Sequence, residues 1–149
     1  MKTNTITRII TISAALTVTL AIGAGAVCAQ DKSNGTVKDG NLFWLKNANC
    51  FERQTWEQAK DSAKKLQSGS CGLTDGSKAG DWRLPTIQEL QTRVNNKRGF
   101  TNVQTYFYWS SSTTDDNTNN AWGVDMGAGN TNAFGKTGSV YVWPVRSGK

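Results

Sequence analysis

The stretch Asp81-Trp82-Arg83-Leu84-Pro85-Thr86-Ile87-Gln88-Glu89-Leu90 decides the fold of the middle of the chain. Pro85 pushes the residue before it out of the helical region, so residues 82–85 are expected to be extended. Thr86 and Glu89 have the spacing of a capping box, in which each side chain accepts a hydrogen bond from the other residue's backbone N–H. A helix is therefore predicted to begin at Thr86 and to end within residues 95–99. Its apolar face is formed by Ile87, Leu90 and Val94.

The same signal occurs earlier in the chain, where Thr55 and Gln58 form a second capping box. A first helix is predicted to begin there and to end before the Ser68-Gly69-Ser70 turn. Its apolar face is formed by Trp56, Ala59, Ala63 and Leu66. Between the two helices, Arg83 is expected to pair with Glu89 as a structural contact.

Hydrophobic residues change from helical to alternating spacing after residue 105, which predicts an antiparallel sheet joined by long polar loops. Pro144 cannot donate to a sheet ladder and is expected near a strand end or on an edge. The predicted strands are residues 41–46, 106–111, 122–126 and 140–145, and residues 127–130 form a turn. The predicted fold class is therefore α+β.

The first 29 residues are typical of a secretory signal peptide, with Lys2 and Arg8 followed by a long uncharged apolar stretch. Cleavage is predicted after Ala29. A lipoprotein anchored through Cys28 and a retained membrane anchor are the alternatives. Residues 30–40 are polar and contain glycine, which predicts a flexible leader, and residues 41–149 are predicted to form a single domain.

Loss of the signal peptide would leave two cysteines, Cys50 and Cys71, in an oxidising compartment. We expect them to form one disulfide, because an even pair in an exported protein usually does. The alternative is a reactive thiol, but the chain has no histidine that could activate one.

These features occur in an order that resembles the Lcl C-terminal domain-like family. The residues that carry the resemblance are Leu42-Phe43-Trp44-Leu45-Lys46-Asn47-Ala48-Asn49-Cys50, Thr55-Trp56-Glu57-Gln58-Ala59, Ser68-Gly69-Ser70-Cys71-Gly72-Leu73, Gly80-Asp81-Trp82-Arg83-Leu84-Pro85, Glu89-Leu90, Tyr108-Trp109-Ser110-Ser111 and Val142-Trp143-Pro144-Val145-Arg146. The resemblance implies a C-type lectin-like fold, in which two helices pack on one twisted antiparallel sheet, and a bacterial surface domain for ligand recognition. It also implies adhesion and binding of a glycan, sulfated in the best-known member.

The chain differs from that family description in three respects, and each one narrows the expected ligand or oligomeric state. It has no collagen-like repeat, which excludes trimerisation by that route, although a homotrimer formed otherwise stays open. Neither proline lies in the Glu-Pro-Asn or Gln-Pro-Asp triplet of calcium-dependent lectins. The basic residues are concentrated in the helical half, so a polyanion is expected to lie across the helices rather than at the loops.

Two polar loops, residues 112–120 and 127–137, are the predicted ligand-binding surface. Asparagine both donates and accepts hydrogen bonds, and two loops joined by the strand around Trp122 are expected to converge. Tyr108 and Phe134 are predicted to be exposed aromatic residues beside them. The candidate ligand-binding residues are Tyr108, Asp115, Asp116, Asn117, Asn119, Asn120, Asn130, Asn132, Phe134 and Lys136. The alternative is that these loops are solvent-exposed polar segments without a binding role.

Other candidate sites have simpler interpretations. Asp115, Asn117 and Asn119 begin a calcium-loop pattern, but Asn120 and Met126 break it, so no metal or cofactor is predicted. Lys60, Lys64 and Lys65 form either a glycan-binding stripe or, as the preceding acids favour, a solvated helix face. The tryptophans Trp82, Trp109, Trp122 and Trp143 are expected to be core rather than sugar-stacking residues.

The leading functional hypothesis is an exported, periplasmic or secreted, recognition domain for an extracellular glycan or cell-surface protein. A self-associating surface protein is the second hypothesis, and a formylglycine-generating type of enzyme is the third and least favoured. The absence of histidine and of an acid pair argues against catalysis. The basic excess is too mild to predict a nucleic-acid partner, and no membrane span is expected in the mature chain.

Overall fold

The structure is a computed structural model that describes residues 33–148. The predicted signal peptide and residues 30–32 therefore lie outside the described residues. The elements are β1 (Thr36–Asp39), β2 (Leu42–Leu45), β3 (Arg53–Gln54), α1 (Trp56–Lys65), α2 (Ile87–Val94), β4 (Phe107–Thr113), β5 (Asn120–Asp125), β6 (Thr131–Gly135), β7 (Val140–Tyr141) and β8 (Val145–Ser147). None of the helices within this range is long and apolar enough to cross a membrane.

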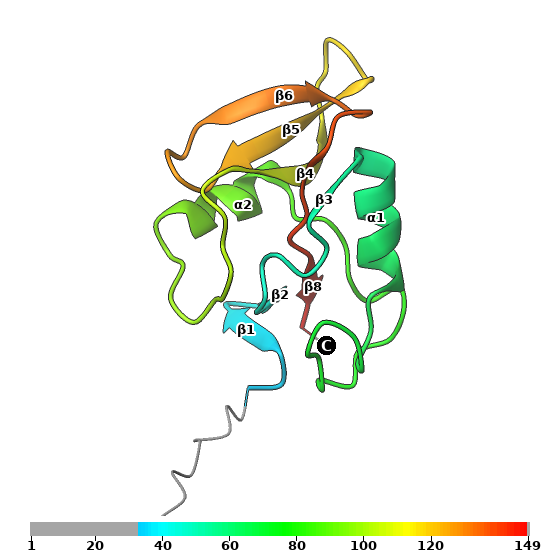
Figure 1. The fold of residues 1–149 in the computed structure, drawn as a ribbon, viewed down its shortest axis with the longest axis vertical. Coiled ribbons are helices and arrows are strands. Elements are labelled where there is room, and N and C mark those ends of the chain that lie inside the picture. The colour runs from blue at the N-terminus through cyan, green and yellow to red at the C-terminus, as the bar shows by residue number, and fades with distance from the viewer. Residues whose placement is uncertain (1–32, 149) are drawn as a thin grey trace, which may run out of the picture. The chain divides into compact units, whose positions relative to one another are not determined.

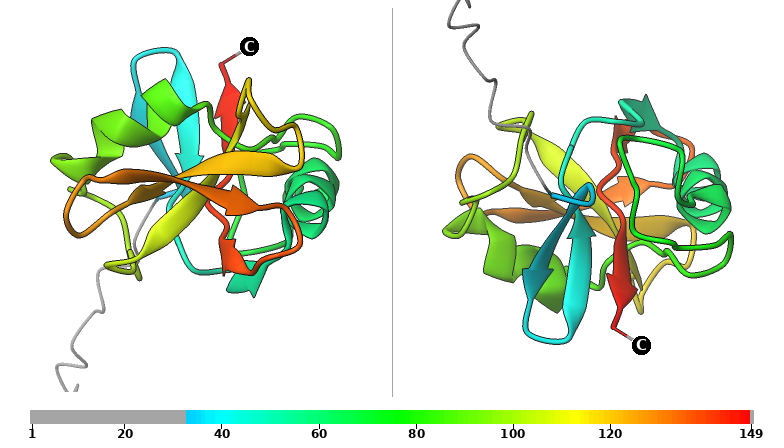
Figure 2. Two further views of the ribbon diagram at one scale, coloured as in Figure 1. Left: turned by 90° about the horizontal axis from the view of Figure 1, so that it is seen from above. Right: turned by 90° about the horizontal axis from the view of Figure 1, so that it is seen from below.

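The fold class is α+β, as predicted, but the strands form two sheets rather than one. The smaller sheet has the order β1-β2-β8 and the larger has the order β3-β7-β4-β5-β6. The larger sheet is mixed, because β4 and β7 run parallel where Tyr108 pairs with Tyr141. α1 and α2 lie on opposite sides of the β4-β5-β6 portion (Figures 1 and 2).

Both helices begin where the capping boxes predict. The side chain of Thr55 accepts from the backbone of Gln58, whose side chain accepts in return from Thr55, and Thr86 and Glu89 do the same in α2. α1 buries Trp56, Ala59 and Ala63, which pack against Trp109 and Val142 in one core cluster. Local signals therefore place each helix, and burial of one face holds it against the sheet.

Tryptophan dominates the core, as the sequence indicates. Trp82, Trp109 and Trp143 are buried, whereas Trp122 is only half-buried. Each of these three indoles donates its N–H: Trp82 to the Ser77 hydroxyl, Trp109 to the Gln54 carbonyl and Trp143 to the Leu45 carbonyl. Satisfied N–H groups let these large rings be buried without a polar penalty.

The Cys50–Cys71 disulfide is present, and its Cα atoms are 5.8 Å apart. It joins the loop after β2 to the loop after α1. Both cysteines pack against the larger core cluster, which contains Trp82, Trp143 and Leu73. The pairing predicted from compartment and parity is thus confirmed.

Part of the predicted flexible leader is a strand. Within the described residues 33–40, β1 pairs in antiparallel register with β2, from Thr36 opposite Leu45 to Asp39 opposite Leu42. Composition missed this strand because its pairing depends on backbone groups, while its side chains are mostly polar. The described domain therefore extends upstream of residue 41.

The predicted last strand, residues 140–145, is split into β7 and β8. Pro144 lies in the gap, where its missing N–H costs no ladder bond. The break carries Val142, Trp143 and Pro144 into the interior, where all three are buried. Val145 then pairs with Trp44 in the smaller sheet, so one short segment links the two sheets.

The serines that follow Trp109 connect the larger sheet to the start of α2. The register of β4 against β5 shifts between Trp109 and Thr113. Within that irregularity the Ser111 N–H donates to the Pro85 carbonyl at 2.7 Å, and the Ser112 hydroxyl accepts from the Ile87 N–H. At the other end of the same segment, the Gly80 N–H donates to the Lys64 carbonyl at 2.7 Å, so residues 80–85 are held against both β4 and α1.

Candidate functional site

The two predicted binding loops do not converge as expected. β4, β5 and β6 form a meander in which Asn120 pairs with Gly135 at one end and Val124 pairs with Thr131 at the other. The turn after β4 therefore lies near the end of β6, and the turn that contains Asn130 lies at the opposite end. A six-residue strand separates the two turns by about 20 Å.

One part of the predicted set does come together, around the turn that joins β4 to β5. Lys136 donates from its ammonium to the Thr118 carbonyl at 2.6 Å and from its backbone N–H to the Asn119 carbonyl at 2.9 Å. The Asn117 side chain accepts from the Asn119 N–H at 3.0 Å. These contacts shape the turn, and the exposed residues at its tip are Asp115, Asp116, Asn117 and Asn119, while Asn120 is half-buried.

Tyr108 was predicted to be exposed, and this prediction is wrong. Its side chain is fully buried, its hydroxyl accepts from the Gln104 N–H at 2.8 Å, and burial raises its pKa to about 12. Its ring packs on Tyr141 and Trp143 at centroid distances of 5.5 Å. The exposed aromatic residue of this segment is Tyr106, two positions earlier on the same face.

The remaining two predicted residues lie on β6. Phe134 is half-buried and makes edge contacts with Phe107 at 4.8 Å and with Trp109 at 6.0 Å. Phe134 therefore serves mainly as packing. Asn132 is exposed on the same face of the strand, opposite Gly123.

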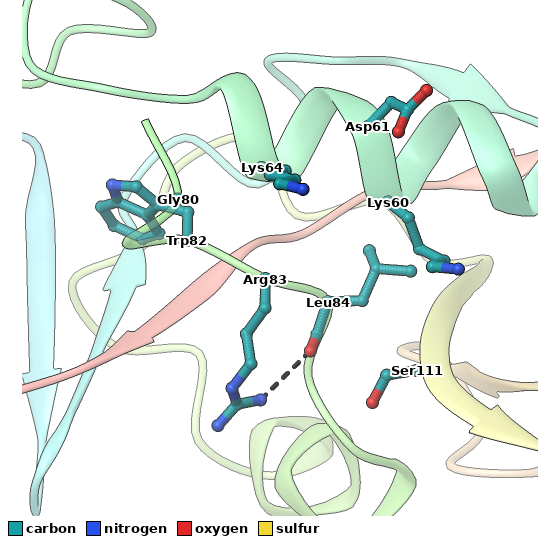
Figure 3. A pocket seen from close by; sticks show the side chains of 8 residues that line it. All are labelled: Lys60, Asp61, Lys64, Gly80, Trp82, Arg83, Leu84 and Ser111. Atoms are coloured by element: carbon teal, nitrogen blue, oxygen red, sulfur yellow. Dashed lines mark hydrogen bonds between the residues drawn. The ribbon is translucent and has the colours of Figure 1, made fainter. Parts of the chain in front are cut away.

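A groove of about 440 Å³ lies elsewhere, between α1 and the segment that leads to Pro85 (Figure 3). One wall comes from the helix and the other from residues 80–84 and β4. The residues that line it are Lys60, Asp61, Lys64, Gly80, Trp82, Arg83, Leu84 and Ser111. We call this the α1 groove.

Helical spacing places two cations on the helix wall of the α1 groove. Lys60 and Lys64 are four residues apart, so they share one face. Burial of Ala59 and Ala63 fixes the rotation of the helix and leaves that face exposed. In Figure 3 both lysine side chains extend from the helix, with Leu84 and Ser111 across from Lys60.

The opposite wall is fixed by Arg83, which pairs with Glu89 as the sequence predicts. Two of its nitrogens each lie 2.8 Å from a carboxylate oxygen of Glu89, and one of them also donates to the Leu84 carbonyl at 3.1 Å. The hydrogen bonds with Arg83 lower the pKa of Glu89, and those with Glu89 raise the pKa of Arg83. This bidentate pair holds the wall rigid but also neutralises much of the arginine charge.

The positive charge available to a ligand in the α1 groove comes mainly from the lysines of α1. Lys60 forms an exposed pair with Glu57 at 3.3 Å, which is weakly stabilising and easily exchanged. Lys64 has no ion pair within the described part of the chain. Asp61 is the acidic residue of the lining.

Lys136 joins the helix face to the β4–β5 turn. Its ammonium lies 4.1 Å from the ring centre of Trp56, and the ammonium of Lys60 lies 4.2 Å from the same ring. A basic track therefore runs from the turn, past Trp56, into the α1 groove. Such a row of ammonium groups can attract and hold an anionic ligand.

Sequence reasoning found the lysines of the helix wall but favoured a solvated helix face over a glycan-binding stripe. The i, i+4 spacing placed Lys60 and Lys64 on one helix face, and the acidic residues that precede them correctly indicated the ion pair between Lys60 and Glu57. The facing wall is set by tertiary contacts that no local pattern reveals. Among the described residues, no group of three or more histidine, cysteine or acidic side chains is placed to hold a metal ion.

Comparisons with known proteins locate the chain in a family. A search of curated proteins found no match. The family model described as the Lcl C-terminal domain matches residues 35–146, a range that includes β1, the disulfide, both helices and the α1 groove. The chain belongs to the Lcl C-terminal domain family.

Proposed function

We propose that this chain is an exported recognition domain of the bacterial cell surface, C-type lectin-like in fold, that binds an anionic extracellular glycan in the α1 groove. The family match favours a surface recognition module. The Cys50–Cys71 disulfide fits a periplasmic or secreted location. A sulfated glycan is the preferred ligand, in an adhesin-like role.

The observation that carries this proposal is the position of Lys64. It lines a groove large enough for a saccharide unit and has no ion pair within the described residues. Lys60 and Lys136 both lie over the Trp56 ring and extend the positive surface from the groove toward the β4–β5 turn. The Ser111 side chain on the facing wall can bond to a ligand oxygen.

A binding role also agrees with the chemistry of the groove. Its titratable residues are lysine, arginine and one aspartate, and the chain has no histidine to act as a proton-transfer group near neutral pH. The paired cysteines offer no thiolate nucleophile. We therefore propose recognition rather than catalysis.

The test measures binding of a heparin-derived oligosaccharide to the full chain expressed with its own leader, at low and high salt. We expect Lys64→Gln to weaken binding about three- to ten-fold at low salt and the affinity to fall as salt rises. Lys65→Gln is the matched control, because it removes the same charge from the same helix outside the groove lining. Equal losses in the two variants would indicate non-specific charge attraction, and no binding by the parent protein would refute the proposal.

A further inference from the structure

A second candidate site lies at the β3-β7-β4 end of the larger sheet, on a row of side chains that runs from the core to the surface. Arg53 of β3 pairs with Tyr141 of β7, and Tyr141 pairs with Tyr108 of β4. Because directly paired residues project from the same face, the three side chains form a row. Tyr106 lies beside it, two residues before Tyr108. We call Arg53, Tyr141 and Tyr106 the tyrosine shelf.

Tyr106 is exposed to an unusual degree for a ring of its size. Its side chain is 63% exposed, and it is the one large hydrophobic side chain among the described residues that stands out in this way. Its ring lies 6.2 Å from that of Tyr141 at an interplanar angle of 33°. Tyr141 in turn packs on buried Tyr108 at 5.5 Å. The exposed ring is thus supported from the core outward and is ready to be stacked upon.

Arg53 provides a fixed hydrogen-bond donor beside the rings. Its guanidinium carbon lies 5.8 Å from the ring centre of Tyr141. Nε and Nη2 donate to the Ser139 carbonyl at 3.1 and 2.6 Å. Nη1 has no hydrogen-bond partner within the described part of the chain, so it remains for a ligand.

The adjoining recess is small and apolar. Its volume is about 70 Å³, and its lining contains no acidic residue. The residues that line it are Arg53, Tyr106, Phe107, Phe134, Val140 and Tyr141. A recess of this size cannot enclose a ring, so a ligand must lie across the rings at the surface.

We propose that the tyrosine shelf binds one neutral hexopyranose ring, by stacking of its C–H face on Tyr106 and a hydrogen bond from Arg53 to a hydroxyl. A pyranose combines an apolar face with a rim of hydroxyl groups, and the shelf combines rings with one rim donor. An acidic sugar is a poorer match, because the engaged Nε and Nη2 leave no free fork for a bidentate carboxylate. This site is separate from the α1 groove and does not depend on the anionic ligand proposed there.

The test is a ¹H–¹⁵N NMR titration of the full chain, expressed with its own leader, with three sugars: methyl β-galactopyranoside, methyl β-glucopyranoside and methyl α-mannopyranoside. We expect at least one to give saturable shifts at the amides of Tyr106, Phe107 and Tyr141. Saturation transfer to the C–H protons of one ring face would identify stacking. The absence of a saturable shift for all three sugars, or shifts confined to the α1 groove, would overturn the proposal.

Variants separate the two contacts. Tyr106→Ala should weaken binding about ten-fold, by analogy with the loss of an aromatic platform, whereas Tyr106→Phe should retain it. Arg53→Gln should weaken binding several-fold, and Lys64→Gln should leave it unchanged. If Tyr106→Ala and the parent bound sugar with equal affinity, the stacking model would be overturned. Binding of a proline-rich peptide to these residues, with no binding of any sugar, would also overturn it. If the parent protein binds one of the three sugars at the tyrosine shelf but does not bind the heparin-derived oligosaccharide, the proposed function is refuted and this inference is not.

Discussion

Arg93 of α2 forms an ion pair with Asp39 of β1 although only 3% of the arginine side chain is exposed. Its guanidinium also lies 5.3 Å from the ring centre of Trp44 and 5.9 Å from that of Phe100. A buried arginine requires such partners, because an unpaired charge in the interior is costly. This contact therefore ties the second helix to the small sheet, including the strand that composition predicted to be a flexible leader.

The first prediction concerns that ion pair. Asp39→Asn leaves the guanidinium buried without a charged partner, and we expect the free energy of unfolding to fall by about 1–3 kcal/mol. Glu57→Gln is the matched control, because it makes the same change in the exposed pair with Lys60 and should cost about 0.5 kcal/mol or less. Urea unfolding followed by tryptophan fluorescence measures both. Equal costs in the two variants would contradict the structural role assigned to Arg93.

A second prediction concerns the disulfide. Cys50 and Cys71 are 21 residues apart, so the bond restricts a loop of moderate length in the unfolded chain. Replacement of both by serine should lower the free energy of unfolding by about 3 kcal/mol. The parent protein in the presence of a reductant should match the double variant. A double variant as stable as the oxidised parent would show that the loop is held without the bond.

Stability should also depend on pH through Asp75, whose side chain is fully buried against Arg146. Burial alone would raise the pKa of Asp75, but hydrogen bonds from Ser77 and Arg146 outweigh it and lower the pKa below its usual value of 3.8. The unfolded chain then binds the proton first as the pH falls. The stabilisation is therefore complete above about pH 4 and is lost as the pH falls through the lower folded-state value.

The measurement is the free energy of unfolding across a series of pH values from 7 to 2. We expect the parent protein to lose stability below about pH 4. Glu89, whose pKa is also lowered, chiefly by its hydrogen bonds with Arg83, should contribute in the same direction. Asp75→Asn should be less stable at pH 7 and should lose less on acidification. A variant with the same pH slope as the parent would exclude Asp75 as a contributor.

The helices could be predicted because their capping signals are local in the sequence. The disulfide could be predicted because an even pair of cysteines is left after cleavage of the signal peptide. Thr55 with Gln58 and Thr86 with Glu89 each complete a capping box within four residues. The strands were predicted less well. β1, β3 and β6 were missed, because their short polar sequences resemble loops and they are stabilised by pairing with distant strands.

The candidate site shows the same division. The lysine stripe on α1 followed from helical spacing, but Arg83 and Ser111 reach the groove through tertiary contacts. The prediction that the two asparagine-rich loops converge did not take into account the geometry of a meander, in which successive turns lie at opposite ends of the sheet. Exposure of Tyr108 was predicted from its polar neighbours, whereas packing against Trp143 decides its burial.

The last prediction tests whether the upstream segment belongs to the domain, through Gly35. This residue has a φ of +80°, and a Cβ added there would lie 2.8 Å from the Leu73 Cα and would also collide with the Gly72 carbonyl. Gly40 also has a positive φ, of +57°, but a Cβ there meets nothing within 4 Å.

Gly40→Ala should therefore cost only the backbone strain of about 1–2 kcal/mol, whereas Gly35→Ala should cost distinctly more, because it must also displace the loop beside Cys71. Chemical unfolding of the two variants measures the difference. If Gly35→Ala were no more destabilising than Gly40→Ala, the segment before β1 would not pack beneath that loop. A larger loss in Gly35→Ala would show that residues upstream of position 41 are part of the folded domain.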